Sequence, residues 1–75
     1  MNGDIAVCTE LADDVAAAVG EGSVDVAVFP PFPYLVPVGH TLGQRGVLLG
    51  GQDCSAEANG AFTGQVSADM LLDIG

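Results

Sequence analysis

The sequence predicts an α/β fold in which two parallel strands are flanked by helices. Two short apolar runs, Val24–Phe29 and Val47–Gln52, have the length and the β-branched or aliphatic content of strands. Helical patterns precede and separate these runs, and strands that alternate with helices form parallel sheets through right-handed crossovers. The 75 residues suffice for one small domain at most, and the stability of such a domain would be marginal.

Residues Asp4–Val19 predict the first helix. Aliphatic side chains recur at every fourth position from Leu11 onward, and the alanines between them raise the helix propensity. Gly20 follows the last of these positions, and a glycine there is typical of a helix C-terminus. Asp4 and Thr9 are both candidate N-caps, and the sequence does not choose between them.

The run Val24–Phe29 is interrupted only by Asp25, so it predicts a strand that is covered on both faces. The segment FPPFPYL follows, and its prolines exclude both a helix interior and sheet pairing, which predicts a rigid turn. A short helix is expected over about Tyr34–Leu42. Pro37 is compatible with this helix only if it lies in the first turn.

The second run, Val47–Gln52, predicts a strand, and its Gly50 and Gly51 indicate that another group packs close to the backbone there. A polar loop follows, and Ser67 then has the character of an N-cap at the start of a third helix. A two-stranded parallel sheet leaves both of its edges unpaired. We therefore expect residues 1–75 to be part of a larger single α/β domain.

The charge balance excludes several classes of partner. Ten Asp and Glu residues stand against Arg45 alone, for a net charge of −9, whereas nucleic acids and anionic membranes bind surfaces rich in cations. The N-terminus lacks the cationic and apolar regions of a signal peptide. The longest uncharged stretch, Val26–Gln44, contains all four prolines, which argues against a membrane-spanning helix. No nucleic-acid or membrane partner is expected.

The residues able to ligate a metal or to act in catalysis form no recognisable motif. Cys8, His40 and Cys54 are too widely spaced for a zinc or redox site, so two free thiols are expected and no metal or cofactor is predicted. We expect His40 at the surface or at a helix end, and Cys54 buried at the base of the polar loop. Asp13 and Asp14 are interpreted as a solvated helix face rather than as paired catalytic carboxylates.

Three segments resemble the triosephosphate isomerase family: Met1-Asn2-Gly3, FPPFPYL and, most specifically, GQDCSAEANGAFTGQVSADMLLDIG. The resemblance implies a partial (β/α)8 barrel, a fold of about 250 residues. The first strand of that barrel and everything after the start of the third helix would lie outside residues 1–75. The family is glycolytic and cytoplasmic, and it interconverts dihydroxyacetone phosphate and D-glyceraldehyde 3-phosphate without a cofactor. Its catalytic Asn, Lys, His and Glu match no position here, so the resemblance implies no catalytic residue in this chain and an inactive fragment.

In this family the loop after the third strand projects from one subunit and inserts beside the active site of its partner. The resemblance places the tip of that loop at Ala61, Phe62, Thr63, Gly64 and Gln65, which implies a homodimer contact through these residues. Thr63 would then reach toward the catalytic lysine of the other subunit. Gln65 stands where an acidic residue is common in the family, so an ion pair between the loops is not implied.

A second hypothesis belongs to a different class: a non-catalytic interaction module. Such a module would dock on another barrel piece or on a full-length enzyme through Ala61–Gln65. This hypothesis rests on an intact partner-facing loop in a chain that matches none of the catalytic motifs. The two hypotheses differ in the size they imply for the native protein, because a module would have the mass of this chain alone.

Overall fold

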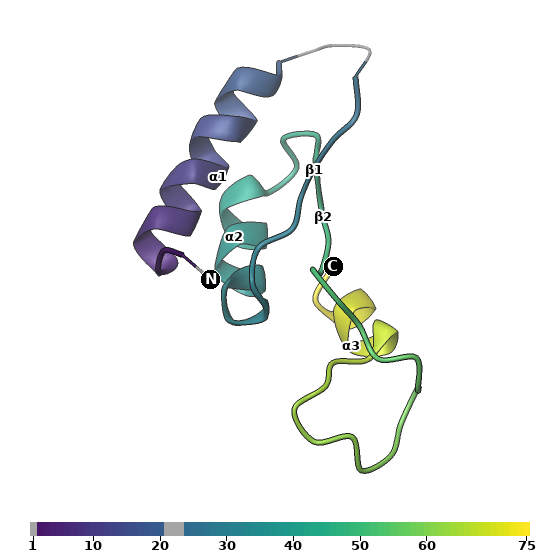
Figure 1. Ribbon diagram of the computed structural model, residues 1–75. Coiled ribbons are helices and arrows are strands. Elements are labelled where there is room, and N and C mark those ends of the chain that lie inside the picture. Colours follow the sequence, from purple (N-terminus) through teal and green to yellow (C-terminus); the bar gives the residue numbers. More distant parts are fainter. Residues whose placement is uncertain (1, 21–23) are drawn as a thin grey trace.

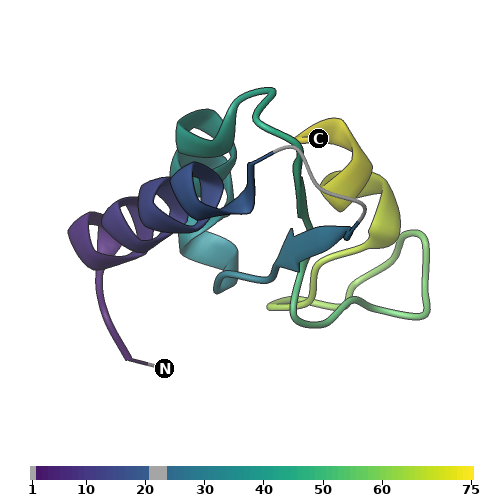
Figure 2. The same cartoon turned by 90° about the horizontal axis from the view of Figure 1, so that it is seen from above.

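A computed structural model describes residues 2–20 and 24–75, so Met1 of the Met1-Asn2-Gly3 motif lies outside the described residues. Helices α1 and α2 lie side by side on one side of a pair of strands, and a long loop projects beyond the strand ends before the chain enters α3 (Figure 1). The same layers are visible from above (Figure 2). Along the chain the elements are α1 (Ile5–Val19), β1 (Val26–Val28), the 3₁₀ turn η1 (Phe32–Tyr34), α2 (Leu35–Leu42), β2 (Val47–Leu49) and α3 (Ala68–Asp73).

Helix α1 follows the predicted span closely. Asp4 is its N-cap, because the carboxylate Oδ1 accepts a hydrogen bond from the backbone N–H of Val7 at 2.9 Å. Thr9, the other candidate cap, lies inside the helix, and its hydroxyl donates to the carbonyl of Ile5 at 2.8 Å. The helix ends at Gly20, whose φ of 51° is a left-handed value that glycine adopts without strain.

The two strands pair in parallel, as the sequence predicts, in the register Val26↔Val47, Ala27↔Leu48 and Val28↔Leu49. Both strands are shorter than the predicted Val24–Phe29 and Val47–Gln52. Prolines follow Phe29 directly and cannot donate to the ladder, so the pairing ends at the next residues of β2.

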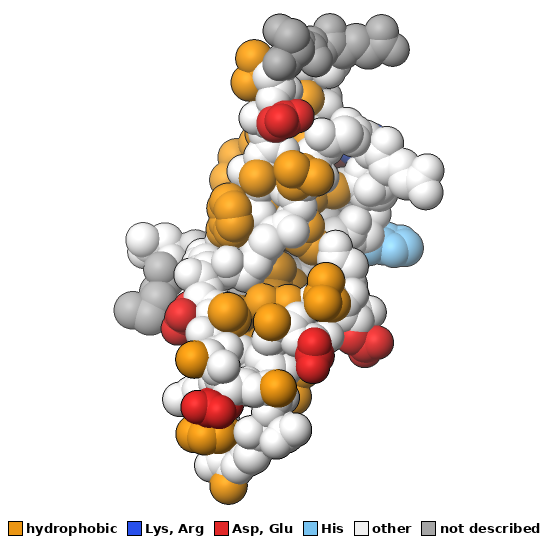
Figure 3. Space-filling model, turned by 90° about the vertical axis from the view of Figure 1, so that its right-hand side faces the viewer, with side chains coloured by type: hydrophobic (Ala, Val, Ile, Leu, Met, Phe, Trp, Pro, Cys, Tyr) orange, Lys and Arg blue, Asp and Glu red, His pale blue; other side chains and the backbone are white. Residues whose placement is uncertain are grey.

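The prediction that the strand at Val24–Phe29 is covered on both faces is correct for one face only, and the same holds for β2. Val26, Val28, Val47 and Leu49 are partly buried toward the helices, whereas the middle residues of both strands point the other way. Leu48, in the middle of β2, is 61% exposed. Apolar side chains are accordingly visible at the surface between acidic ones (Figure 3).

The core lies between α1 and α2. Ala12 and Ala16 of α1 pack against Val38 and Leu42 of α2, and the small alanines let the two helix backbones approach. Leu35 at the start of α2 is also buried. The rigid turn predicted before α2 takes the form of the 3₁₀ turn η1. Pro37 lies in the first turn of α2, the one place in the helix where the sequence analysis allowed it.

An ion pair on the protein surface connects α1 with the turn that follows α2. Arg45 Nη1 lies 2.6 Å from Oδ1 of Asp13, and Nη2 donates to the backbone carbonyl of the same residue at 3.3 Å. Asp13 and Asp14 are exposed, as predicted, but Asp13 also has this partner, which the sequence reading missed. None of the helices in the described ranges has the length and apolar character that a membrane crossing requires.

Candidate functional site

The loop that carries the predicted contact residues begins where β2 ends. The backbone N–H of Gly50 donates to the carbonyl of Val28 at 3.0 Å and so extends the ladder by one bond. A Cβ on Gly50 would lie 2.5 Å from Cε1 of Phe29, so the aromatic ring packs directly on this backbone. The prediction that a group packs close to these glycines is therefore confirmed. Gln52 adds a second link, since Nε2 donates to the carbonyl of Phe29 at 2.7 Å.

Residues 53–66, called here the projecting loop, are closed by their own hydrogen bonds. The N–H of Ser55 donates to the carbonyl of Val66 at 2.7 Å, which brings the two arms of the loop together at its neck. The hydroxyl of Ser55 accepts from the N–H of Glu57 at 3.1 Å. A surface loop with close ends that is supported by internal contacts is an Ω-loop, and such loops are frequently functional.

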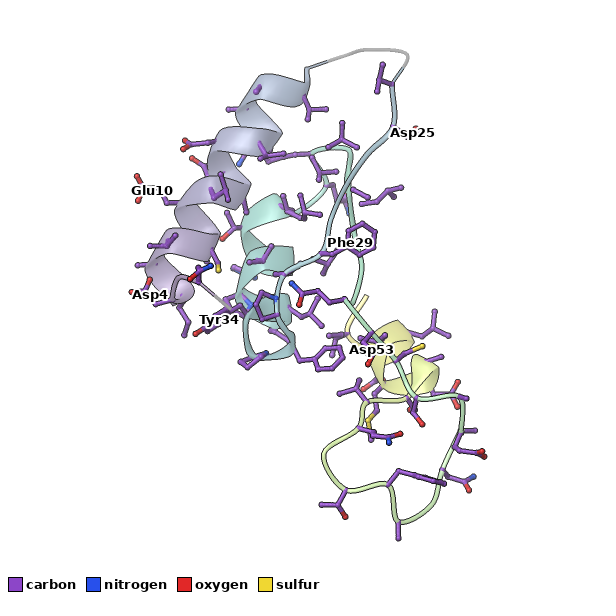
Figure 4. The ribbon with its side chains drawn as sticks, in the orientation of Figure 1. Asp4, Glu10, Asp25, Phe29, Tyr34 and Asp53 are labelled. Atoms are coloured by element: carbon purple, nitrogen blue, oxygen red, sulfur yellow. The ribbon has the colours of Figure 1, made fainter. Side chains whose placement is uncertain are left out.

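The tip of the projecting loop is a tight turn. The N–H of Gln65 donates to the carbonyl of Phe62 at 3.0 Å, and Gly64 within this turn has a φ of 91°, which only glycine adopts readily. Phe62 is 45% exposed, and its ring lies against Gly60, where an added Cβ would meet Cε2 at 2.8 Å. All five residues of Ala61–Gln65 are exposed, so the structure brings the predicted contact residues together at one projecting end (Figure 4).

The exit of the loop is fixed by α3. Ser67 is 8% exposed, and its Oγ accepts from the N–H of Met70 at 3.3 Å, which confirms Ser67 as the N-cap. Helix α3 returns to the sheet, because both Leu71 methyl groups would lie 3.1 Å from a Cβ on Gly51. The loop is therefore held at both ends, while the residues of its tip remain exposed.

The remaining candidate residues do not converge. His40 is exposed in the last turn of α2, as expected, and Cys8 is partly buried on α1. The expectation that Cys54 is buried at the base of the loop is wrong: its thiol is exposed, because the loop leaves the body at this point and no element covers it. In residues 2–20 and 24–75, no group of three His, Cys, Asp or Glu side chains is placed to hold a metal ion.

A hollow of about 220 Å³ lies between α1 and the end of β1. Its walls are almost wholly apolar, and they include Cys8, Leu11, Val15, Val28, Phe29 and Val38. No carboxylate, imidazole or amide side chain lines it. The hollow therefore offers mainly hydrophobic contact, and its lining lacks the convergent polar side chains that orient a polar substrate.

The sequence profile of the triosephosphate isomerase family matches residues 1–75 of this chain. The chain belongs to the triosephosphate isomerase family. A triosephosphate isomerase of Hahella chejuensis is 44% identical over 73 residues, which cover 97% of this chain and 29% of the relative. Those of Xanthomonas campestris pv. campestris and Cupriavidus taiwanensis are 41% and 43% identical over 75 residues, which cover this whole chain and 30% of each relative.

The chain thus spans about 30% of the length of the triosephosphate isomerases that it matches. The two parallel strands and their helices agree with the predicted partial barrel, and the closed barrel itself is not part of these residues. The family match runs through the whole projecting loop. Sequence reasoning missed the role of Gln52, because a side-chain bond to a residue 23 positions earlier leaves no local signal.

Proposed function

We propose that this chain supplies part of a triose-phosphate isomerase subunit, including the loop through which that subunit contacts a second copy. The whole protein would interconvert dihydroxyacetone phosphate and D-glyceraldehyde 3-phosphate in the cytoplasm, without a cofactor. The observation that carries the proposal is the family match over residues 1–75, with relatives named triosephosphate isomerase at 41–44% identity. The shape of the projecting loop supports the contact role.

Three features make the tip of the loop suitable for docking. The tip is an exposed aromatic side chain, Phe62, on a turn that is closed before any partner arrives. A preformed turn loses little conformational freedom on binding, which favours affinity. Residues 58–67 carry no charged side chain in a chain of net charge −9, so the tip can be covered by a partner without burying an unpaired charge.

Chemistry would come from outside these residues. By the family resemblance, the catalytic Asn, Lys, His and Glu match no position of the chain, and Thr63 would approach the lysine of the other subunit. The alternative hypothesis of an interaction module gains no support from the comparisons, because the relatives that they name are isomerases.

The first experiment is the intact mass of the native protein that contains the sequence GAFTGQVS, purified from its source cells and assayed for triose-phosphate interconversion. We expect a mass several times 7.5 kDa, isomerase activity, and a dimer in sedimentation. The purified 75-residue chain, assayed beside it, is expected to show no turnover. A native mass near 7.5 kDa, or turnover by the short chain, would contradict the proposal.

A further inference from the structure

Phe29 contacts the end of β2 in two independent ways. Its ring packs on the backbone of Gly50, and its carbonyl accepts the hydrogen bond of 2.7 Å from Nε2 of Gln52. Phe29, labelled in Figure 4, is the residue directly after β1. Gln52 directly precedes Asp53, the first residue of the projecting loop. The residue that follows β1 therefore carries both the apolar and the polar contact to the root of the loop.

The main chain does not supply this link. The ladder runs as far as the bond from Gly50 to Val28. The next bond of a parallel ladder would run from the N–H of residue 30 to the carbonyl of Gly50, which Pro30 cannot donate, and the one after it from the N–H of Gln52 to the carbonyl of Pro30. No such bond is formed among the described residues, because the prolines turn the chain away from β2. The side chain of Gln52 instead donates to the carbonyl of Phe29, one residue earlier than the carbonyl that a continued ladder would have used.

The other hydrogen bonds of this region are internal to the loop or lead into α3. The bonds at the neck and at the tip join loop residues to one another. Within the part of the chain that the structure describes, the Gln52 side chain makes the one hydrogen bond between residues 51–66 and the preceding elements. Internal bonds fix the shape of the loop, and on the N-terminal side its direction is constrained by this hydrogen bond together with the packing of Phe29 on Gly50.

We propose that Gln52 is a positioning residue: its side-chain amide holds the root of the projecting loop to the end of β1 and so sets the direction in which Ala61–Gln65 are presented. The consequence for a second subunit rests on the proposed function. The positioning itself does not, because it concerns contacts within one chain.

The test compares Gln52→Met, which keeps the length of the side chain but removes the N–H donor, with Gln52→Lys, which retains a donor. Gln44→Met, at an exposed glutamine in the turn after α2, is the matched control. All are made in the native protein that carries this segment, and amide hydrogen exchange is measured residue by residue. In Gln52→Met we expect exchange at Gly50 to rise about two- to fivefold, the effect of losing one exposed hydrogen bond.

The pattern of exchange separates positioning from general support. Ser55, whose N–H closes the neck of the loop, and the amides of α1 are expected to keep their exchange rates in Gln52→Met. Gln52→Lys is expected to restore the rate at Gly50, and Gln44→Met to leave it unchanged. An unchanged rate at Gly50 in Gln52→Met overturns the inference. An equal rise at Gly50, Ser55 and α1 also overturns it, because Gln52 would then stabilise the whole fold.

A second readout, the dissociation constant of the native dimer from sedimentation, tests the consequence for docking. Gln52→Met is expected to weaken association about two- to fivefold, and Gln52→Lys to recover it. If the root loosens in Gln52→Met while association is unchanged, the loop does not dock and the proposed contact fails, whereas the positioning of the loop by Gln52 stands. The two failures are thus distinguishable.

Discussion

The contact between Gly50 and Phe29 makes Gly50→Ala the most informative single substitution in the chain. A Cβ at this position would lie 2.5 Å from Cε1 and 2.8 Å from Cδ1 of the ring, closer than real Cβ atoms approach. Gly50 has no left-handed φ, so an alanine suffers no backbone strain there. The whole effect of the substitution on the folded state therefore comes from the clash with one aromatic ring.

Two responses to the clash compete, and the structure decides between them. Forcing the extra methyl group against a fixed ring costs about 1–3 kcal/mol. If the ring of Phe29 instead rotates into solvent, the protein loses the free energy contributed by the buried part of that ring. Phe29 is 56% exposed, so less than half of the roughly 1.5–3 kcal/mol for a fully buried phenylalanine is at stake, or about 1 kcal/mol. The ring is expected to move out, because that response is the cheaper one.

The ring contact is isolated by a double-mutant cycle with Phe29→Ala, measured by urea unfolding of the native protein that carries this segment. Alanine in place of glycine also restricts the unfolded chain, which stabilises by about 0.4–1 kcal/mol in either background. We therefore expect Gly50→Ala to be near neutral alone, stabilising in Phe29→Ala, and coupled to it by about 1 kcal/mol.

Gly39→Ala is the matched control for this cycle. Its Cβ would meet Cδ2 of Leu49 at 2.9 Å, the far end of a flexible side chain, and no atom of Phe29 lies within 4 Å of it. The coupling of Gly39→Ala to Phe29→Ala is expected to be near zero. If Gly50→Ala shows no more coupling than this control, the ring does not pack on the backbone of β2 and the account of the loop root is wrong.

Three further substitutions test the core, the ion pair and the loop. Leu42→Ala removes a fully buried side chain from the core between the helices and is expected to lower the free energy of unfolding by about 2–5 kcal/mol in urea titrations; a loss well under 1 kcal/mol would refute that core. Arg45→Gln breaks an exposed pair with Asp13, and its cost, under about 1 kcal/mol, should shrink further in 1 M salt; a salt-independent cost would argue against an ionic origin. Gly60→Ala combines a φ of 124° with a clash against Phe62 and is expected to destabilise the tip by about 1–3 kcal/mol, seen as faster amide exchange at Gln65; unchanged exchange would contradict it.

The helices were predictable because their signals are local. Asp4 and Ser67 cap α1 and α3 through bonds to residues three positions later, and Gly20 ends α1 through its own φ. Pro37 fixed where α2 begins by the same kind of rule, since it fits only the first turn. The strands were predicted in place and direction but too long, because the end of a ladder depends on the partner strand, and the prolines that end β1 also end the pairing of β2.

The same distinction between local and long-range contacts applies to the projecting loop. Its shape comes from bonds between near neighbours, such as the turn from Phe62 to Gln65, and a loop with glycines at these positions was recognisable in the sequence. Its direction comes from Gln52 and Gly50, whose common partner Phe29 lies 23 and 21 positions earlier, and no local sequence pattern near the loop indicates these contacts. The exposure of Cys54 has the same origin, because a thiol at the base of a loop is covered or bare according to where the loop points. The sequence thus predicts which side chains a contact loop offers to a partner. The direction in which the loop presents them depends on distant residues that hold the root of the loop.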